Sequence, residues 1–168
     1  VHRATKGMRE VPILAAGGIC TGEQMAGAMA MGASGAWCAS VFLTTSEAET
    51  SEVVKEKMLA ATSKETVRSR SRTGKHSRQL QSDWTDAWES DGAPEPLPMP
   101  LQTMVSEPAL DKINKAAEVD HEGAKKLATY WVGQGIGLVD EKITAGQTVQ
   151  KFKEEFIEAY ERLNNFME

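Results

Sequence analysis

Short apolar runs and one stretch of helical periodicity make up the first part of the chain. The run Val11–Ala16 is apolar and two glycines close it, a pattern that is typical of a strand buried on both faces. The segment Thr21–Met31 predicts a helix that Thr21 caps and Gly32 ends. A second strand is expected over Gly35–Ala39, so strand, helix and strand form a parallel βαβ unit.

A capping box predicts one more helix after this unit. Ser46 stands three residues before Glu49, the spacing at which serine and glutamate satisfy backbone N–H groups reciprocally, and the helix is expected to reach about Ala61. Two strands are too few for a stable parallel sheet, which needs further strands and cover on both faces. We therefore expect an N-terminal part or a partner chain to complete the sheet, and we read Val1, in place of a starting methionine, as a sign of truncation.

The middle of the chain, residues 63–105, is expected to be irregular. One part of it lacks acidic residues and carries the basic side chains Arg68, Arg70, Arg72, Lys75 and Arg78. Trp84 and Trp88 follow, as packing residues or as the lining of a substrate channel, and then four alternating prolines favour an extended path. The basic side chains could form a solvated loop, or they could lie over a binding site and attract an anion.

Residues 106–168 are expected to be mainly helical. Ser106 can cap a first helix, a second covers roughly Glu122–Trp131, and a glycine-rich segment interrupts it. Thr144 and Gln147 form a capping box that begins the last helix. Spacings of three and four predict a buried stripe along this helix, formed by Val149, Phe152, Phe156, Tyr160 and Leu163.

Composition and charge narrow the classes of function. The chain has 168 residues, of which 40% are hydrophobic and 26% charged, values close to those of globular domains. No apolar stretch approaches the roughly 20 residues that span a membrane, and no signal-peptide pattern is visible. The net charge of −5 argues against nucleic-acid binding. Two cysteines cannot build a disulfide framework, so we expect buried thiols, no metal site and a reducing, cytoplasmic location.

Small residues follow both predicted strands at equivalent places. Ala16, Gly17 and Gly18 end the first strand, and Ala39 and Ser40 end the second. Such residues let backbone N–H groups approach a phosphate, as in the loops after strands seven and eight of (β/α)8 barrels. The alternative is that the glycines form tight turns only. The spacing does not match G-x-G-x-x-G, so a dinucleotide-binding turn is not expected.

Several motifs, in order along the chain, resemble one family. They are Val11–Ile19, Ala28–Ala33, Trp37–Thr44, Thr66–Lys75, Asp83–Trp88, Pro98–Gln102 and Gly133–Leu138. Together they resemble the nitronate monooxygenase (2-nitropropane dioxygenase) family, whose members are FMN-dependent (β/α)8 barrel enzymes related to flavin enoyl-reductases. The resemblance covers nearly the whole chain and is weakest over residues 106–130.

The resemblance implies an α/β fold, the C-terminal part of a (β/α)8 TIM barrel. Residues 1–62 would hold the last βα units, with Val11–Ala15 as strand seven and Gly35–Ala39 as strand eight. Residues 63–105 would form an irregular segment over the barrel mouth, and residues 106–168 a helical C-terminal extension. Trp37 and Cys38 would point to opposite faces of strand eight, one into the barrel and one toward the helices.

The resemblance also implies an FMN site. Ala16, Gly17 and Gly18 would hold one side of the FMN phosphate, and Ala39 and Ser40 the other. Ala39 stands where the family has glycine and Val41 where arginine is common, and neither change abolishes a site built from backbone N–H groups. Gln134, in a segment similar to the family's G-Q-x-x-G element, could face the pocket or could belong to a structural turn.

The family's catalytic histidine lies upstream of the sequence that this chain matches. His2, His76 and His121 do not correspond to it and are expected on the surface, so we expect no catalytic residue in this chain. The implied reaction is the oxidation of an anionic nitronate or a nitroalkane by O2, and the chain alone is expected to be inactive. A flavin enoyl-reductase using NAD(P)H and a non-catalytic binding or assembly module remain as alternatives.

Overall fold

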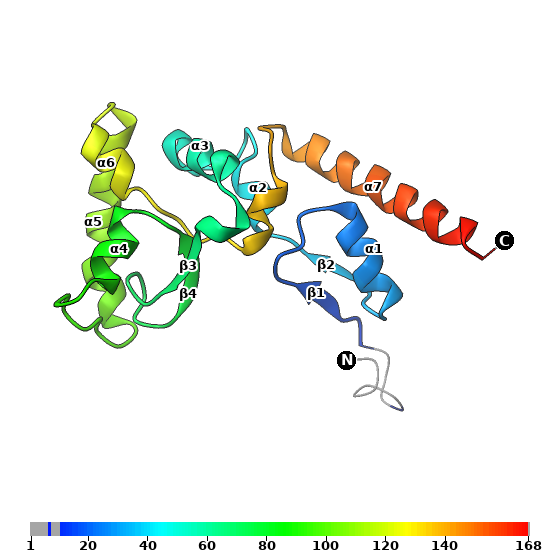
Figure 1. Cartoon of the computed structure of the whole chain (residues 1–168), viewed down its shortest axis with the longest axis horizontal. Coiled ribbons are helices and arrows are strands. Elements are labelled where there is room, and N and C mark those ends of the chain that lie inside the picture. Colours follow the sequence, from blue (N-terminus) through cyan, green and yellow to red (C-terminus); the bar gives the residue numbers. More distant parts are fainter. Residues whose placement is uncertain (1–6, 8–10, 168) are drawn as a thin grey trace. The chain divides into compact units, whose positions relative to one another are not determined.

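The computed structural model describes residue 7 and residues 11–167 of the chain (Figure 1). The chain forms two compact units. Unit 1 consists of Val1–Ala48 and Glu141–Glu168, and unit 2 consists of Glu49–Asp140. The first unit is therefore discontinuous in sequence, and the second is inserted into it. These boundaries differ from the expected division at residues 62 and 105, because the last helix packs beside the first.

Unit 1 is a small α/β structure built on a parallel strand pair. Its elements are β1 (Leu14–Ala16), α1 (Gly22–Ala30), β2 (Gly35–Trp37), α2 (Ser40–Leu43) and α7 (Ala145–Asn165). The two strands pair in parallel, with Leu14 opposite Gly35 and Ala16 opposite Trp37. This pairing confirms the predicted βαβ unit, although each strand is shorter than the apolar run that predicted it.

Helix α1 begins where the sequence predicts. The Thr21 hydroxyl accepts a hydrogen bond from the Gln24 N–H at 3.2 Å, and the Gln24 side chain accepts one from the Thr21 N–H at 3.2 Å. This reciprocal pair is a capping box, and it satisfies two of the N–H groups that a helix start leaves without partners. The predicted Thr144–Gln147 box at the start of α7 is confirmed in the same way.

Helices α1 and α7 lie side by side in direct backbone contact (Figure 1). Gly22 makes the contact possible, because a Cβ atom there would stand 2.1 Å from the Phe152 carbonyl oxygen. The Gly22 N–H also donates to the Glu155 carboxylate at 2.7 Å. Phe152 and Ala159 are buried at this contact. The first residue of α1 therefore anchors a helix that follows it by more than a hundred positions.

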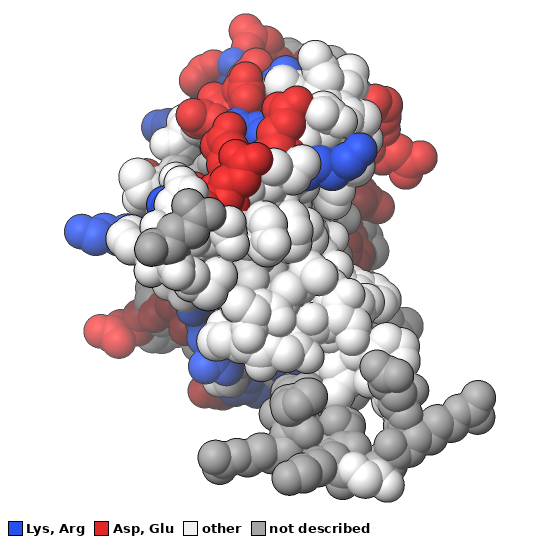
Figure 2. All heavy atoms as spheres, turned by 90° about the vertical axis from the view of Figure 1, so that its right-hand side faces the viewer, with Lys and Arg blue, Asp and Glu red and all other residues white. Residues whose placement is uncertain are grey.

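The buried stripe predicted along α7 is only partly buried. Phe152 is buried and Phe156 is half-buried, but Val149, Tyr160 and Leu163 are exposed. Helix α1 has 9 residues and α7 has 21, or about 14 Å and 32 Å at 1.5 Å per residue, so α1 can cover only part of the longer helix. Figure 2 shows the face that holds the C-terminal end of α7, where acidic side chains gather above a broad area with few charges.

The capping box expected at Ser46 and Glu49 is wrong. Helix α3 (Glu52–Ala60) begins later, after the N-cap residue Ser51. The Ser46 N–H instead donates to the Ile143 carbonyl at 3.1 Å, and the neighbouring Glu47 carboxylate accepts from the Ala145 N–H at 2.9 Å. Ser46 and Glu47 therefore hold the start of α7 in place. Local spacing does not reveal this contact, because its partners are distant in the sequence.

Unit 2 contains more regular structure than expected. It consists of α3, the 3-10 turn η1 (Ser63–Glu65), β3 (Thr66–Ser69), β4 (Ser77–Leu80), α4 (Asp83–Glu89), α5 (Leu101–Glu118), α6 (Glu122–Leu127) and η2 (Gln134–Leu138). Strands β3 and β4 pair antiparallel, with Thr66 opposite Leu80. The prediction of an irregular segment is therefore wrong for β3, β4 and α4, and it holds for residues 70–76 and for the proline-rich residues 93–99, which form neither helix nor strand.

Helix α5 starts five residues before the predicted cap. Ser106 lies inside the helix, where its buried hydroxyl donates to the Arg72 carbonyl at 2.6 Å instead of capping. Sequence reasoning preferred Ser106 because serine is a favoured N-cap residue. The observed N-cap is Pro100, whose side chain makes no capping hydrogen bond.

The second predicted helix of this region ends at Leu127, short of the expected Trp131. Residues 129–132 are extended and lie along β4: the Leu80 N–H donates to the Tyr130 carbonyl at 3.0 Å, and the Val132 N–H donates to the Arg78 carbonyl at 3.2 Å. Strand β4 had an unpaired edge, and pairing with it satisfies backbone groups of both segments.

Lys57 closes the C-terminal end of α6. Its Nζ donates to the carbonyls of Lys125, Lys126 and Ala128 at 3.0, 3.3 and 2.6 Å. Burial lowers the pKa of this ammonium, and the nearby Asp83 carboxylate partly offsets the effect. A cation at a helix C-terminus also interacts favourably with the helix dipole. None of the helices in the described part of the chain is long and apolar enough to span a membrane.

Substitution of Gly22 tests the α1–α7 contact. We expect Gly22→Ala to lower the free energy of unfolding by about 1–3 kcal/mol, the usual range for overpacking. The reason is that the new Cβ would collide with the backbone of α7. Gly27→Ala in the same helix is the control, since a Cβ there meets nothing within 4 Å, and it should stabilise by about 0.5–1 kcal/mol. Urea unfolding followed by circular dichroism measures both, and equal effects would contradict the close contact.

Replacing Lys57 tests whether its ammonium group stabilises the C-terminal end of α6. We expect Lys57→Met to destabilise by about 1–3 kcal/mol, because three carbonyls lose a charged donor. Lys64→Met, at an exposed position of η1, is the matched control and should change stability by less than about 0.5 kcal/mol. Thermal unfolding compares the two, and an unchanged midpoint for Lys57→Met would rule the closure out as a stabilising contact.

Candidate functional site

Two consecutive glycines turn the chain sharply where β1 ends. Gly17 and Gly18 have φ angles of +103° and +72°, a left-handed region that side chains rarely adopt. An added Cβ would meet no atom within 4 Å at either position, so the turn borders open space. Their backbone N–H groups donate to no other residue in the described part of the chain. The turn therefore offers two N–H groups to a ligand.

The second loop of the predicted site leaves the sheet at the same edge. Because Ala16 pairs with Trp37 in a parallel register, Gly17 and Gly18 follow one strand where Cys38 and Ala39 follow the other. Ala39 has φ −127° and precedes the four-residue helix α2, in which Ser40 is half-buried. The structure thus places the two predicted loops at the carboxyl ends of neighbouring parallel strands.

The N-terminus of α1 is already occupied by side chains of the same chain. The Gln24 carboxamide oxygen accepts from the Cys20 N–H at 2.8 Å and the Thr21 N–H at 3.2 Å. The Glu155 carboxylate accepts from the Gly22 N–H at 2.7 Å. A phosphate cannot use these donors as it does at many helix N-termini. An anion bound to unit 1 would instead need the backbone N–H groups of the two loops that follow β1 and β2.

The two cysteines beside these loops are protonated at neutral pH. Burial raises the pKa of the Cys20 thiol to about 11, helped by the nearby Cys38 and opposed by a hydrogen bond from the Val41 backbone. Burial also raises the pKa of Cys38, which is half-buried. Thiolates are the reactive form of cysteine, so neither residue is a ready nucleophile. The expectation of buried thiols is confirmed for Cys20, whereas Cys38 is only half-buried.

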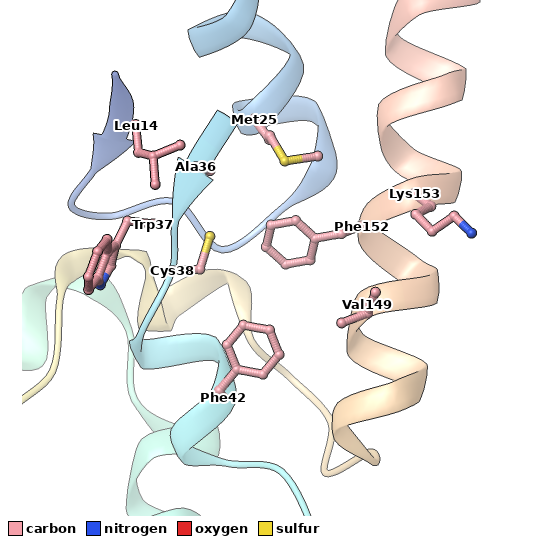
Figure 3. Close-up of a pocket in the computed structure, with 9 residues that line it drawn as sticks. All are labelled: Leu14, Met25, Ala36, Trp37, Cys38, Phe42, Val149, Phe152 and Lys153. Carbon is pink, nitrogen blue, oxygen red and sulfur yellow. The ribbon is translucent and has the colours of Figure 1, made fainter. Parts of the chain in front are cut away.

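An apolar groove of about 430 Å³ lies between the strands and α7 (Figure 3). Its walls are Leu14, Met25, Ala36, Trp37, Cys38, Phe42, Val149, Phe152 and Lys153. Cys38 points toward Phe152, whereas Trp37 turns away from α7 and is 68% exposed, which confirms their predicted alternation. The walls of this groove come from segments far apart in the chain, so the groove could not be predicted from the sequence, where the apolar stripe of α7 is its only signal.

Gln134, the remaining predicted cofactor contact, belongs to unit 2. It is the first residue of η2 and is exposed, while the following Gly135 and Ile136 are buried. Gly137 packs against η1, where an added Cβ would stand 2.6 Å from the Ser63 nitrogen. Gln134 can therefore belong to a structural turn and still expose its amide to a ligand, so the two interpretations from the sequence do not exclude each other.

The two histidines in the described part of the chain lie on the surface. His76 is exposed, and so is His121, whose Nδ1 accepts from the Ala124 N–H at 3.2 Å and caps α6. These positions confirm the surface prediction, while His2 lies outside the described residues. Within the described ranges, no group of three or more His, Cys, Asp or Glu side chains could hold a metal ion.

Most arginines of the basic segment are bound inside unit 2. Arg70 pairs with Glu95 at 3.2 Å, Arg72 pairs with Glu107 at 2.7 Å, and Arg78 donates to the Thr66 carbonyl at 3.1 Å. This structural role differs from both predicted alternatives, a solvated loop and a basic segment that attracts an anion to a binding site. The acidic partners Glu95 and Glu107 stand 25 and 35 residues away from their arginines, so no local pattern in the sequence reveals the pairing.

The comparisons with known proteins agree on one family. The family model described as nitronate monooxygenase matches residues 1–155. A Mycobacterium tuberculosis protein, whose name provisionally assigns it to the monooxygenases, is 52% identical over 94% of this chain and 42% of its own length. The chain spans between 40% and 42% of the length of the curated relatives that it matches.

Solved structures show the same relationship. The nitroalkane oxidase from Streptomyces ansochromogenes superposes with a TM-score of 0.76 at 26% identity, over 92% of this chain and 42% of that chain. FabK from Thermotoga maritima superposes with a TM-score of 0.71 at 28% identity, over 94% of this chain and 48% of that chain. Because the family match covers more than half of the sequence, this chain belongs to the nitronate monooxygenase family.

Proposed function

We propose that this chain supplies the C-terminal part of a (β/α)8 barrel in an FMN-dependent oxidoreductase of the nitronate monooxygenase type. In this proposal β1 and β2 are strands seven and eight. The parallel β1–α1–β2 unit supports it, as do the family match and the superposition on a nitroalkane oxidase of which the chain covers 42%. The proposed substrate is an alkyl nitronate or nitroalkane, and O2 is the proposed oxidant.

The turn at Gly17 and Gly18 is the observation that carries the proposal. Two N–H groups without a partner in the described chain, next to open space, fit an acceptor with several oxygens such as the FMN phosphate. Ala16, Gly17 and Gly18 would hold one side of that phosphate, and Ala39 and Ser40 the other. Both positions have positive φ angles, which glycine adopts without strain, and this suits a site built from backbone N–H groups.

The departure at Ala39 is compatible with this role. The φ angle of −127° is negative, so Ala39 lies outside the left-handed region that favours glycine, the residue that relatives carry there. Val41, which stands where arginine is common, is buried in unit 1. The proposed site therefore relies on backbone N–H groups and has no guanidinium from this position.

Gln134 is proposed as a second contact to the flavin. Its exposed carboxamide can both donate and accept hydrogen bonds, which suits the edge of a flavin ring. When bound, FMN supplies the redox chemistry, in which the substrate is oxidised and O2 takes up the electrons. The residues of this chain bind and orient the cofactor. The base that removes a substrate proton is proposed to lie outside this chain, because His76 and His121 are on the surface.

The likeness to FabK favours a second candidate function, a flavin enoyl-reductase that uses NAD(P)H. Both candidates share the FMN phosphate site and differ in the electron donor and the acceptor. A non-catalytic binding module is the alternative from another class. Flavin binding separates the module from the two enzymes, and turnover separates the enzymes from each other.

Flavin binding tests the phosphate site. We expect the chain to bind FMN more tightly than riboflavin, which lacks the phosphate, and we expect Gly18→Val to raise the Kd for FMN by about tenfold. That factor corresponds to about 1.4 kcal/mol. The riboflavin Kd should stay the same in this variant. Gly27→Ala, on an open face of α1, is the control and should change neither value. Quenching of flavin fluorescence measures the Kd of the unaltered chain and of both variants for each flavin.

Turnover then decides between the enzymes. The chain is mixed with a polypeptide that carries the N-terminal part of a family member, and O2 uptake is followed with alkyl nitronates. We expect uptake that depends on both parts and on FMN. Oxidation of NAD(P)H with an enoyl substrate, and none with nitronates, would favour the reductase. Equal binding of FMN and riboflavin by every variant would refute the phosphate site.

A further inference from the structure

The buried Arg72 and the half-buried Glu107 form an ion pair next to the segment that leads to Gln134. We propose that Arg72 is a positioning residue, which fixes this segment and so places the Gln134 carboxamide. The inference rests on the proposed function, because the placement of Gln134 matters for catalysis only if this residue contacts the flavin.

Helix α5 holds the guanidinium of Arg72 in one orientation. Arg72 is 2% exposed. Its Nε donates to Glu107 Oε1 at 2.7 Å and its Nη2 donates to Oε2 at 3.1 Å, so both carboxylate oxygens are engaged by a planar fork. The carbonyl of Arg72 also accepts from the Ser106 hydroxyl at 2.6 Å. Main chain and side chain of Arg72 are thus fixed to neighbouring residues of the same helix.

The fixed guanidinium packs on two aromatic rings. Its central carbon lies 4.0 Å from the centre of the Trp131 ring and 5.0 Å from the centre of the Tyr130 ring. The two rings contact each other edge to face, with their centres 5.5 Å apart. A cation over an aromatic face is attracted by the ring quadrupole, and the flat guanidinium also stacks. Arg72 therefore locks the side chains of two residues that stand just before Gln134.

Gln134 lies between two anchored points of unit 2. On its N-terminal side, backbone bonds to β4 hold one edge of residues 130–132, and Arg72 holds the rings. On its C-terminal side, Ile136 is buried and Gly137 packs against η1. The exposed amide of Gln134 is thus presented by a short segment that cannot shift far. Loss of Arg72 would leave the N-terminal anchor with backbone bonds alone.

The ion pair is better explained by orientation than by stability. Burying a charge is costly, and the Arg72 guanidinium is buried although Glu107 is only half-buried. A hydrophobic pair of similar volume often stabilises a fold as well or better. Arg72 Nη1 is also buried without a hydrogen-bond partner among the described residues, which adds to the cost. What a hydrophobic pair lacks is the planar fork that fixes direction. This difference allows positioning to be separated from folding.

The double variant Arg72→Met with Glu107→Leu removes the fork and keeps the packed volume. We expect it to unfold at an unchanged or higher temperature, while amide exchange at Ile136, whose N–H donates to the Gly133 carbonyl, becomes about tenfold faster. The Kd for FMN should rise by about tenfold. Arg70→Met with Glu95→Leu removes an exposed pair two residues away and is the matched control, for which neither quantity should change.

Arg72→Lys provides a second variant in case the double variant does not fold. Lysine keeps the charge beside Glu107 but has no planar fork, so it should also speed exchange at Ile136 and weaken FMN binding. Unchanged exchange in a folded variant would overturn the proposal, and so would faster exchange with an unchanged Kd. If the unaltered chain binds no FMN, the proposed function fails, and the exchange rates alone decide whether Arg72 fixes the segment.

Discussion

The close contact between the start of α1 and the middle of α7 is the constraint on which unit 1 depends. At Gly22 the two backbones approach so closely that a single methyl group would overlap a carbonyl oxygen. The N–H of the same residue donates a hydrogen bond to the Glu155 carboxylate, so close packing and a hydrogen bond to a charged group stabilise the same contact. Because α7 also forms one wall of the apolar groove, the position of the groove follows from this contact. The strand pair contributes only three residues from each strand.

Unit 2 depends on buried polar contacts more than on a large apolar core. Gln79, Gln102 and Arg72 are fully buried, and each is hydrogen-bonded to a neighbouring segment. Such groups are tolerated inside a protein only when their partners are in place, so they favour one arrangement over near alternatives. This explains how a segment rich in arginine, serine and proline can form an ordered structure without much hydrophobic surface.

Local sequence patterns predicted the elements that are stabilised locally. The cap at Thr21 and the capping box at Thr144 could be predicted because both partners of each hydrogen bond lie within four residues. The errors at Ser46 and Ser106 share another cause, since both residues bond to segments that are distant in the sequence. The paired glycines and the small residues after β2 were evident from the sequence, because turns constrain residue type. The groove and the stacking on Trp131 depend on tertiary contacts and could not be predicted.

The division of unit 1 into two stretches of sequence also determines when each unit can fold during synthesis. Residues 49–140 leave the ribosome together, so unit 2 has all its segments before α7 has been made. Unit 1 must wait until the residues of α7 emerge, and until then the partner surface on α1 faces water. Within this chain, the segment that holds β1 and α1 is synthesised before unit 2 but is covered by α7 only after unit 2 has been made, and the risk of aggregation during translation lies in the apolar residues of that segment.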